Sequence, residues 1–102
     1  MLAVFSVLPV GVGEALSEHV ARIVDIIDGS GLEYRLGAMA TTVEGEENEV
    51  MELVMKCHRA ALEAAPRVFT SVTIDDREGA TGRLTGKIDD VERILGRRVK
   101  HG

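Results

Sequence analysis

The order in which strand-like and helix-like patterns follow one another restricts this chain to a small number of folds. Four segments have the apolar character or the alternation of β-strands: 2–8, 33–39, 41–44 and 67–75. Two longer segments repeat apolar residues at helical spacing: 16–27 and 50–64. The order βαββαβ predicts a ferredoxin-like α+β sandwich, a four-stranded antiparallel sheet with both helices on one face.

Local signals support these boundaries. The first helix is expected to end at Asp28-Gly29-Ser30-Gly31, where glycine allows a left-handed turn, and the second is expected to end at Pro66. The segments 33–39 and 41–44 follow each other so closely that a hairpin is their simplest arrangement. Apolar residues within 88–95 predict a further amphipathic helix at the C-terminus. With 102 residues, the chain is expected to form a single domain, 1–102.

Charge and composition exclude several classes of partner. The formal net charge is −5, whereas nucleic-acid-binding domains are usually basic, so no nucleic acid is expected. No apolar run approaches the roughly 20 residues that cross a bilayer, and no Lys or Arg precedes the apolar start, so neither a membrane span nor a signal peptide is expected. Cys57 is the only cysteine, which leaves no disulfide framework. We therefore expect a cytoplasmic protein.

Familiar cofactor and catalytic motifs are incomplete. Gly11-Val12-Gly13 lies between a strand and a helix, but Leu16 stands where a dinucleotide loop needs its third glycine. Gly86-Lys87 is followed by Ile88 rather than by the Ser or Thr of a phosphate loop. The three histidines lack metal-ligand spacing, and His58 is expected to be packed or half-exposed. The sequence therefore predicts no metal, no cofactor and no catalytic residue.

Acidic residues gather at two places whose roles the sequence leaves open. Asp76 follows the last predicted strand, where it either caps a turn or contacts a ligand. Acidic residues also precede the second helix, whose dipole favours negative charge at this end. Most of this second group is expected to be capping charge and solvated surface: Glu44, Glu46, Glu47 and Glu49.

The predicted sheet has one face that the two main helices leave open. Strand alternation places aliphatic, aromatic and hydroxyl side chains on it: Val4, Ser6, Leu8, Phe69, Ser71 and Thr73. A surface this apolar usually marks an interface, so we expect a homo-oligomer in which sheets of two subunits stack. The alternative is that the C-terminal helix of the same chain folds back over this face.

Several strings resemble the small thiamine-binding protein family. They are Pro9-Val10-Gly11, Thr41-Thr42-Val43-Glu44-Gly45-Glu46, Glu49-Val50-Met51 and Ser71-Val72-Thr73-Ile74-Asp75-Asp76-Arg77, and the similarity runs from about Val4 to Leu95. The resemblance implies the ferredoxin-like fold, tetramers built as pairs of dimers, and binding of thiamine or its hydroxymethylpyrimidine precursor without established catalysis.

Thiamine chemistry then suggests where a ligand would bind. An aminopyrimidine needs hydroxyls or a carboxylate at its edge and an apolar wall beneath its ring, and the thiazolium cation needs a carboxylate or an aromatic face. Ser6, Ser71 and Thr73 are the candidate hydroxyls on the open face. Thr42 and Glu44 are expected to point to the same face, with Phe69 or Met39 as the wall and Asp76 as a further contact.

Three classes of function fit these expectations. The first is a non-catalytic oligomer that binds thiamine or a related pyrimidine. The second is an enzyme of pyrimidine or thiamine metabolism, with Glu44 or Asp76 as proton-transfer group. The third is a regulatory or scaffolding module whose oligomer surface is the functional surface.

Overall fold

The computed structural model describes residues 1–79 and 81–101. Its elements follow the predicted order: β1 (Leu2–Val10), a 3₁₀ turn (Gly13–Ala15), α1 (Leu16–Asp28), β2 (Glu33–Leu36), β3 (Thr41–Glu44), α2 (Glu47–Ala64), β4 (Arg67–Asp75) and α3 (Arg83–Leu95). The strands form one sheet in the order β2-β3-β1-β4, and every neighbouring pair is antiparallel. The α+β, ferredoxin-like expectation is confirmed.

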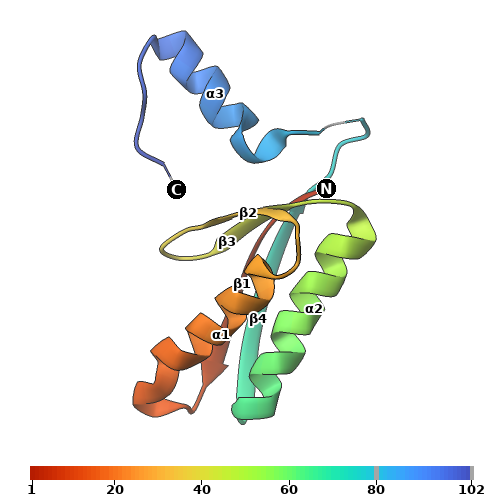
Figure 1. Cartoon of the computed structure of the whole chain (residues 1–102), viewed down its shortest axis with the longest axis vertical. Helices are drawn as coiled ribbons and strands as arrows, with labels where there is room; N and C mark the ends of the chain where they lie inside the picture. Colours follow the sequence, from red (N-terminus) through yellow and green to blue (C-terminus); the bar gives the residue numbers. More distant parts are fainter. Residues whose placement is uncertain (80, 102) are drawn as a thin grey trace.

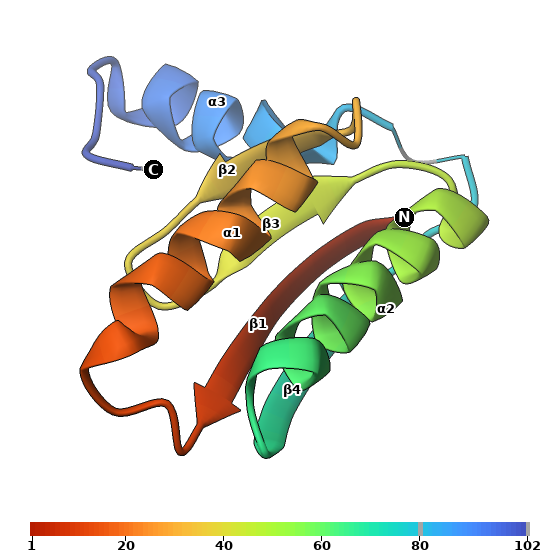
Figure 2. The same ribbon diagram turned by 60° about the horizontal axis from the view of Figure 1, so that its bottom comes forward.

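Two layers enclose the core. Helices α1 and α2 lie side by side across one face of the sheet (Figures 1 and 2). Phe5 and Val43 point from the sheet into this layer, where Ile27 of α1 and Val54 of α2 meet them, all of them buried. Cys57 lies fully buried on the same face of α2, as its place in the helical stripe predicts.

The start of α2 shows what the acidic cluster before it does. Glu46 is the N-cap residue and forms a reciprocal capping box with Glu49, whose Oε1 accepts the Glu46 N–H at 3.3 Å. Such a box satisfies backbone N–H groups that the first helical turn leaves without partners. The interpretation of this cluster as capping charge is therefore confirmed for Glu46 and Glu49.

The hairpin between β2 and β3 is shorter than the sequence predicts. The expected strand 33–39 ends at Leu36, because the Gly37 N–H turns to donate to the Ala40 carbonyl at 3.0 Å. Strand β3 has only four residues, so it pairs with β1 only from Leu2 to Phe5, whereas β4 pairs with β1 over its full length, from Leu2 to Val10. One edge of β1 therefore has no strand of the described residues beside it from residue 6 onward.

Helix α3 lies on the opposite side of the sheet from α1 and α2 (Figure 1). It packs over β2 and β3, where Leu84 and Ile88 face Arg35 and Thr42 across a small cavity. The C-terminal helix of the same chain thus covers the half of the open face that β2 and β3 form, as the alternative expectation proposed. It leaves uncovered the half that β1 and β4 form. No helix among the described residues is long and apolar enough to span a membrane.

Candidate functional site

The eight side chains that the sequence suggests for a ligand do not converge on one pocket of the single chain. The structure distributes them over three places. These are the uncovered half of the sheet with Ser6, Phe69, Ser71 and Thr73, the region at the start of α3 with Thr42, Glu44 and Asp76, and a crevice beside β1 with Met39, which the strand edge at Ser6 also borders.

The uncovered half of the sheet, which we call the bare face, is broad and has no helix over it. Register pairs Val4 with Thr73, Ser6 with Ser71 and Leu8 with Phe69, so these six side chains form three rows across β1 and β4. Phe69 is 53% exposed and Leu8 is 49% exposed. The Arg67 guanidinium lies 4.6 Å from the centroid of the Phe69 ring, a cation–π contact at one end of the face. Its shape suits another protein surface better than a small ligand.

The carboxylate of Glu44 lies at the start of α3, and both of its oxygens accept hydrogen bonds there. Its Oε2 accepts the Arg83 N–H at 2.9 Å and its Oε1 accepts the Leu84 N–H at 3.1 Å. The N-cap residue Gly82 has no side chain to do this, so a carboxylate from β3 caps a helix 39 residues further along the chain. Glu44 thus binds its own chain.

An acidic hollow of about 590 Å³ opens beside this cap. Its wall contains six carboxylates against the guanidinium of Arg77, and they belong to Glu33, Glu44, Glu46, Glu49, Asp76 and Glu78. Asp76 also faces the N-terminal amine, with Oδ1 3.8 Å from the nitrogen, while that amine donates to the Gly45 carbonyl at 2.9 Å. Asp76 therefore lies in an acidic surface at the end of β4, away from the hydroxyls of the bare face.

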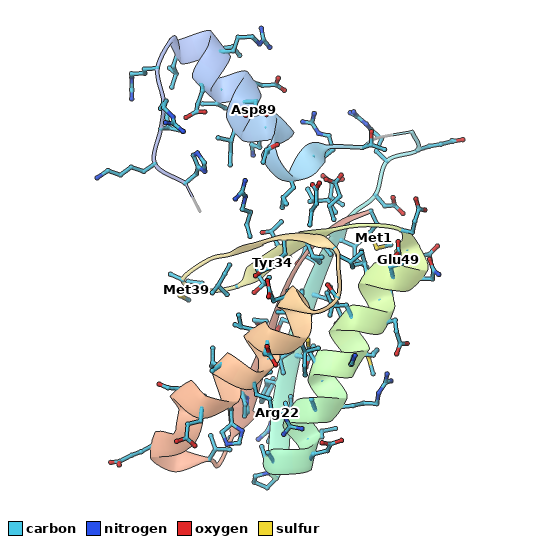
Figure 3. The ribbon with its side chains drawn as sticks, viewed as in Figure 1. Met1, Arg22, Tyr34, Met39, Glu49 and Asp89 are labelled. Atoms are coloured by element: carbon cyan, nitrogen blue, oxygen red, sulfur yellow. The ribbon has the colours of Figure 1, made fainter. Side chains whose placement is uncertain are left out.

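A crevice of about 440 Å³ opens on the helix side of the sheet, between α1, the unpaired edge of β1 and the β2–β3 turn. Its floor is made by the buried side chains of Phe5, Ile23 and Ile27. Exposed apolar side chains form the rim, which includes Val20, Leu36 and Met39. Met39 lies at the turn of the hairpin (Figure 3) and is 90% exposed. The volume falls within the usual range for small-ligand pockets, about 300–1,000 Å³.

Polar groups in the crevice are few and uncharged. Thr41 is only 6% exposed, lines the crevice and forms no side-chain hydrogen bond with another described residue. The backbone of Ser6, Val7 and Leu8 borders the crevice where β1 lacks a neighbour on the β3 side. A strand edge without a partner presents N–H donors and C=O acceptors in alternation. The described lining therefore combines apolar walls with a short row of hydrogen-bonding groups and contains no ionisable side chain.

Sequence reasoning named Met39 as a ligand contact but did not name Thr41 or the α1 residues Val20 and Val24 of the crevice, and it assigned Ser6 to the open face rather than to the crevice. A signal was present in the segment lengths. The predicted first strand has more residues than 41–44, so its far end must lack a partner in an antiparallel pair with that segment. The apolar alternation of the open face is the stronger signal in the sequence, and it points to the other side of the sheet.

His58 is half-buried, as expected, and does not belong to any of these three places. Its Nδ1 lies 2.6 Å from Oγ1 of Thr70, which joins α2 to β4. The Cys57 thiol is also remote from the surface, and its burial raises its pKa to about 11, so the reactive thiolate is suppressed at neutral pH.

Known proteins resemble this chain in sequence over most of its length. A family model described as thiamine-binding protein matches residues 3–92. UPF0045 protein Mb1933 of Mycobacterium bovis is 40% identical over 96 residues, which cover 93% of this chain and 94% of the relative. A UPF0045 protein of Methanothermobacter thermautotrophicus is 36% identical, covering 91% of this chain and 97% of the relative.

Solved structures share the same fold. A Thermotoga maritima protein described as a candidate for thiamine biosynthesis or salvage superimposes with a TM-score of 0.77 at 28% identity, covering 88% of this chain and 97% of that one. A domain of unknown function from Bacillus cereus also gives a TM-score of 0.77 at 28% identity, covering 85% of each chain.

Proposed function

Because the chain belongs to the thiamine-binding protein family, we propose that it is a non-catalytic, cytoplasmic small-molecule binding protein that holds a pyrimidine ring in the crevice. The ring is that of thiamine or of its hydroxymethylpyrimidine precursor. The observation that carries the proposal is the unpaired edge of β1 beside an apolar crevice with the Thr41 hydroxyl at its wall.

The aminopyrimidine ring matches this surface chemically. It is flat, and its exocyclic amino group is a donor next to a ring nitrogen that accepts. A strand edge offers the complementary pair of C=O and N–H groups, as it does when a peptide strand is added to a sheet. The apolar floor of Phe5, Ile23 and Ile27 lies beneath the space such a ring would fill. Met39 keeps its expected role as a ligand contact and Thr41 joins it, whereas Ser6 contributes its backbone at the strand edge because its side chain lies on the bare face.

The absence of charge in the described lining of the crevice favours the neutral pyrimidine over the thiazolium cation as the group recognised there. A cation gains from a nearby carboxylate, and the carboxylates of this chain gather instead at the other end of β1, around Met1 and Asp76. We therefore expect the free pyrimidine to bind at least as tightly as thiamine. A lining without an ionisable group also offers no general acid or base, which supports binding without catalysis.

Calorimetric titration with 4-amino-5-hydroxymethyl-2-methylpyrimidine and with thiamine tests the proposal. Val20→Phe places a ring at the crevice rim and is expected to abolish binding, whereas Ala21→Phe, on an exposed neighbouring position outside the lining, is its matched control. Thr41→Val removes one hydroxyl with little change in shape, and we expect about a 2- to 12-fold weaker Kd. No heat and no thermal shift at millimolar ligand would show that the crevice is not a pyrimidine site.

The second part of the proposal is assembly into a homotetramer, a pair of dimers. The chain exposes 7022 Å², whereas a compact monomer of 11.0 kDa exposes roughly 5,600 Å². The excess of about 1,400 Å² exceeds the roughly 800 Å² that each partner buries in a typical specific interface. The bare face supplies exposed apolar side chains for such contacts, and we assign Phe69, Ser71 and Thr73 to it rather than to the ligand. Sedimentation of the chain at one-chain mass at micromolar concentration would contradict assembly while leaving the titration result valid.

A further inference from the structure

A small cavity lies between α3 and the sheet, on the side opposite α1 and α2 (Figure 1). Its volume is about 220 Å³, below the roughly 300–1,000 Å³ that is usual for small-ligand pockets, so it suits an occupant of only a few non-hydrogen atoms. One wall is apolar and comes from Leu84 and Ile88 of α3. The facing wall is polar and comes from Arg35 of β2 and Thr42 of β3.

Strand register brings the two polar side chains of the sheet together. Arg35 and Thr42 are direct partners in the β2–β3 pair, so both point to the α3 side of the sheet with Cβ atoms about 5 Å apart. Neither side chain forms an ion pair or a hydrogen bond with another described residue. A guanidinium and a hydroxyl therefore border the cavity with hydrogen-bond donors that the described chain leaves available.

The C-terminal tail supplies a third polar group. After α3 the chain turns back toward the sheet (Figure 1), and Glu92 holds this turn. Its Oε2 accepts the Val99 N–H at 2.7 Å, and its carbonyl accepts the Gly96 N–H at 2.9 Å. The imidazole of His101 thereby joins the lining of the cavity. The β2–β3 hairpin, α3 and the tail thus build the cavity together.

Charge distinguishes this cavity from the acidic hollow beside Glu44. The chain has a formal net charge of −5, yet the described lining of the cavity contains a guanidinium, an imidazole and no carboxylate. Six carboxylates line the acidic hollow instead. Coulomb attraction therefore favours an anion at the cavity over the hollow. A guanidinium matches a carboxylate in particular, because it donates two parallel hydrogen bonds to the two oxygens.

We propose that this cavity binds a small aliphatic monocarboxylate. The guanidinium of Arg35 pairs with the carboxylate, the Thr42 hydroxyl donates a further hydrogen bond, and the alkyl chain lies against Leu84 and Ile88. One guanidinium balances one negative charge, and the apolar wall has nothing to contact on a bare inorganic anion, so a carboxylate fits better than phosphate. Thr42, which the sequence suggests as a ligand contact, has its ligand role here rather than in the crevice.

The carboxylate site is separate from the proposed pyrimidine site and goes beyond it. The crevice lies on the side of the sheet that α1 and α2 cover, and among the described lining residues only Gly37 borders both spaces. The carboxylate site also depends on no second chain. A bound carboxylate joins the hairpin to α3, so it should stabilise the packing of α3 on the sheet in proportion to its occupancy.

An NMR titration of the full chain with sodium propionate tests the site, with the Arg35 Nε–H resonance as the probe. Propionamide, which has a similar shape without the charge, and sodium phosphate are titrated in parallel at constant ionic strength. We expect a saturable shift with propionate, none with propionamide, and slower amide exchange in 83–95 when propionate is bound. Phosphate binding as tight as that of propionate would overturn the assignment to a carboxylate. No saturable shift with propionate would overturn the site itself.

Three variants locate the binding, followed through the backbone amide resonance of Leu84. Arg35→Gln removes the guanidinium, and we expect at least ten-fold weaker propionate binding. Thr42→Val removes the hydroxyl, and we expect binding about 2- to 12-fold weaker. Lys87→Gln is the matched control, because it removes one positive charge from an exposed position of α3 outside the described lining, and its Kd should stay within about two-fold.

Circular dichroism checks that each variant keeps its fold, and calorimetry checks that each still binds the pyrimidine. Equal weakening by Arg35→Gln and Lys87→Gln would mean that propionate follows the overall positive charge and not the cavity, which contradicts the proposal. The carboxylate result and the pyrimidine result are thus obtained from different ligands and can fail separately.

Discussion

The carboxylate of Glu44 accepts a hydrogen bond from the backbone N–H of Arg83 at 2.9 Å, which ties the start of α3 to the central part of the sheet. Gly82 and Gly79, both with positive φ, lie in the connection just before this point. Apart from this cap, α3 rests on the sheet only through half-buried side chains. Glu44 is therefore the main polar anchor of α3.

Removal of this anchor should loosen α3 without unfolding the domain. In Glu44→Ala the cap is lost, and we expect about 1–2 kcal/mol less stability for α3, seen as a loss of amide protection in 83–95 of about 5- to 30-fold. Glu44→Gln keeps one acceptor oxygen, so its amide protection in 83–95 should lie between that of the unmodified protein and that of Glu44→Ala. Hydrogen-exchange mass spectrometry measures both.

Glu33→Ala is the matched control, because Glu33 is the register partner of Glu44 on β2 and caps no helix in the described chain. Equal loss of amide protection in Glu33→Ala and Glu44→Ala would contradict the role of Glu44 as the anchor of α3. Glu44→Gln should also leave pyrimidine binding within about two-fold, since Glu44 is not part of the crevice lining.

In the turn between β1 and α1, alanine substitutions at two glycines should differ clearly in their cost to the free energy of unfolding. Gly11 has a φ of +84°, and a Cβ at this position would lie 2.9 Å from Cγ of Pro66, so Gly11→Ala combines backbone strain with a clash. Gly13 has a φ of +61° but open space where a methyl group would lie. We expect Gly11→Ala to cost about 2–4 kcal/mol and Gly13→Ala about 1 kcal/mol. Urea denaturation measures both, and equal costs would mean that the Pro66 contact is unimportant.

Much of the fold could be predicted because it depends on local periodicity. The alternation in 67–75 and the helical stripe that contains Cys57 are visible in sequence, and both elements form where predicted. The end of β2 could not be predicted, since Ala38 and Met39 continue the alternation and only the Gly37–Ala40 hydrogen bond shows that the chain has turned.

The candidate site was harder to predict than the fold because it depends on contacts distant in sequence. The resemblance indicated the ligand class, but the position of α3 depends on Glu44 meeting Arg83, a contact no spacing rule reveals. The crevice arises from a mismatch in strand length between β1 and β3, so its wall combines Thr41 with Val20 of α1. Such a site is visible only after the strand register is known.

The contact between α2 and β4 provides a simple test of a polar interaction in the fold. His58 Nδ1 and Thr70 Oγ1 are 2.6 Å apart in a half-buried position. Thr70→Val keeps the shape but leaves the imidazole without this partner, and we expect a loss of about 1 kcal/mol in the free energy of unfolding. Thr70→Ser keeps the hydroxyl and should retain most of that stability. A Thr70→Val protein as stable as the unmodified one would mean that water replaces the hydroxyl without cost.

Alkaline pH should weaken the fold through Cys57. Burial raises the pKa of its thiol from 9.0 to about 11, so the folded state holds its proton at pH values where the unfolded chain has lost it. The resulting stability is fully present below pH 9 and is lost as the pH rises from 9 to 11, because unfolding then releases a proton. The upper bound is about 2.7 kcal/mol for a shift of two pKa units.

Cys57→Ala isolates this contribution from that of other groups, including Tyr34, whose pKa is raised by its hydrogen bond to Asp28. The variant should be less stable at pH 7, since it leaves a small cavity, but its stability should fall less steeply between pH 9 and 11. Urea denaturation at each pH gives the two slopes. In parallel, an aromatic disulfide reagent at pH 8 should label native Cys57 only as fast as the domain opens, and labelling at the rate of a free thiol would show that the side chain is accessible after all.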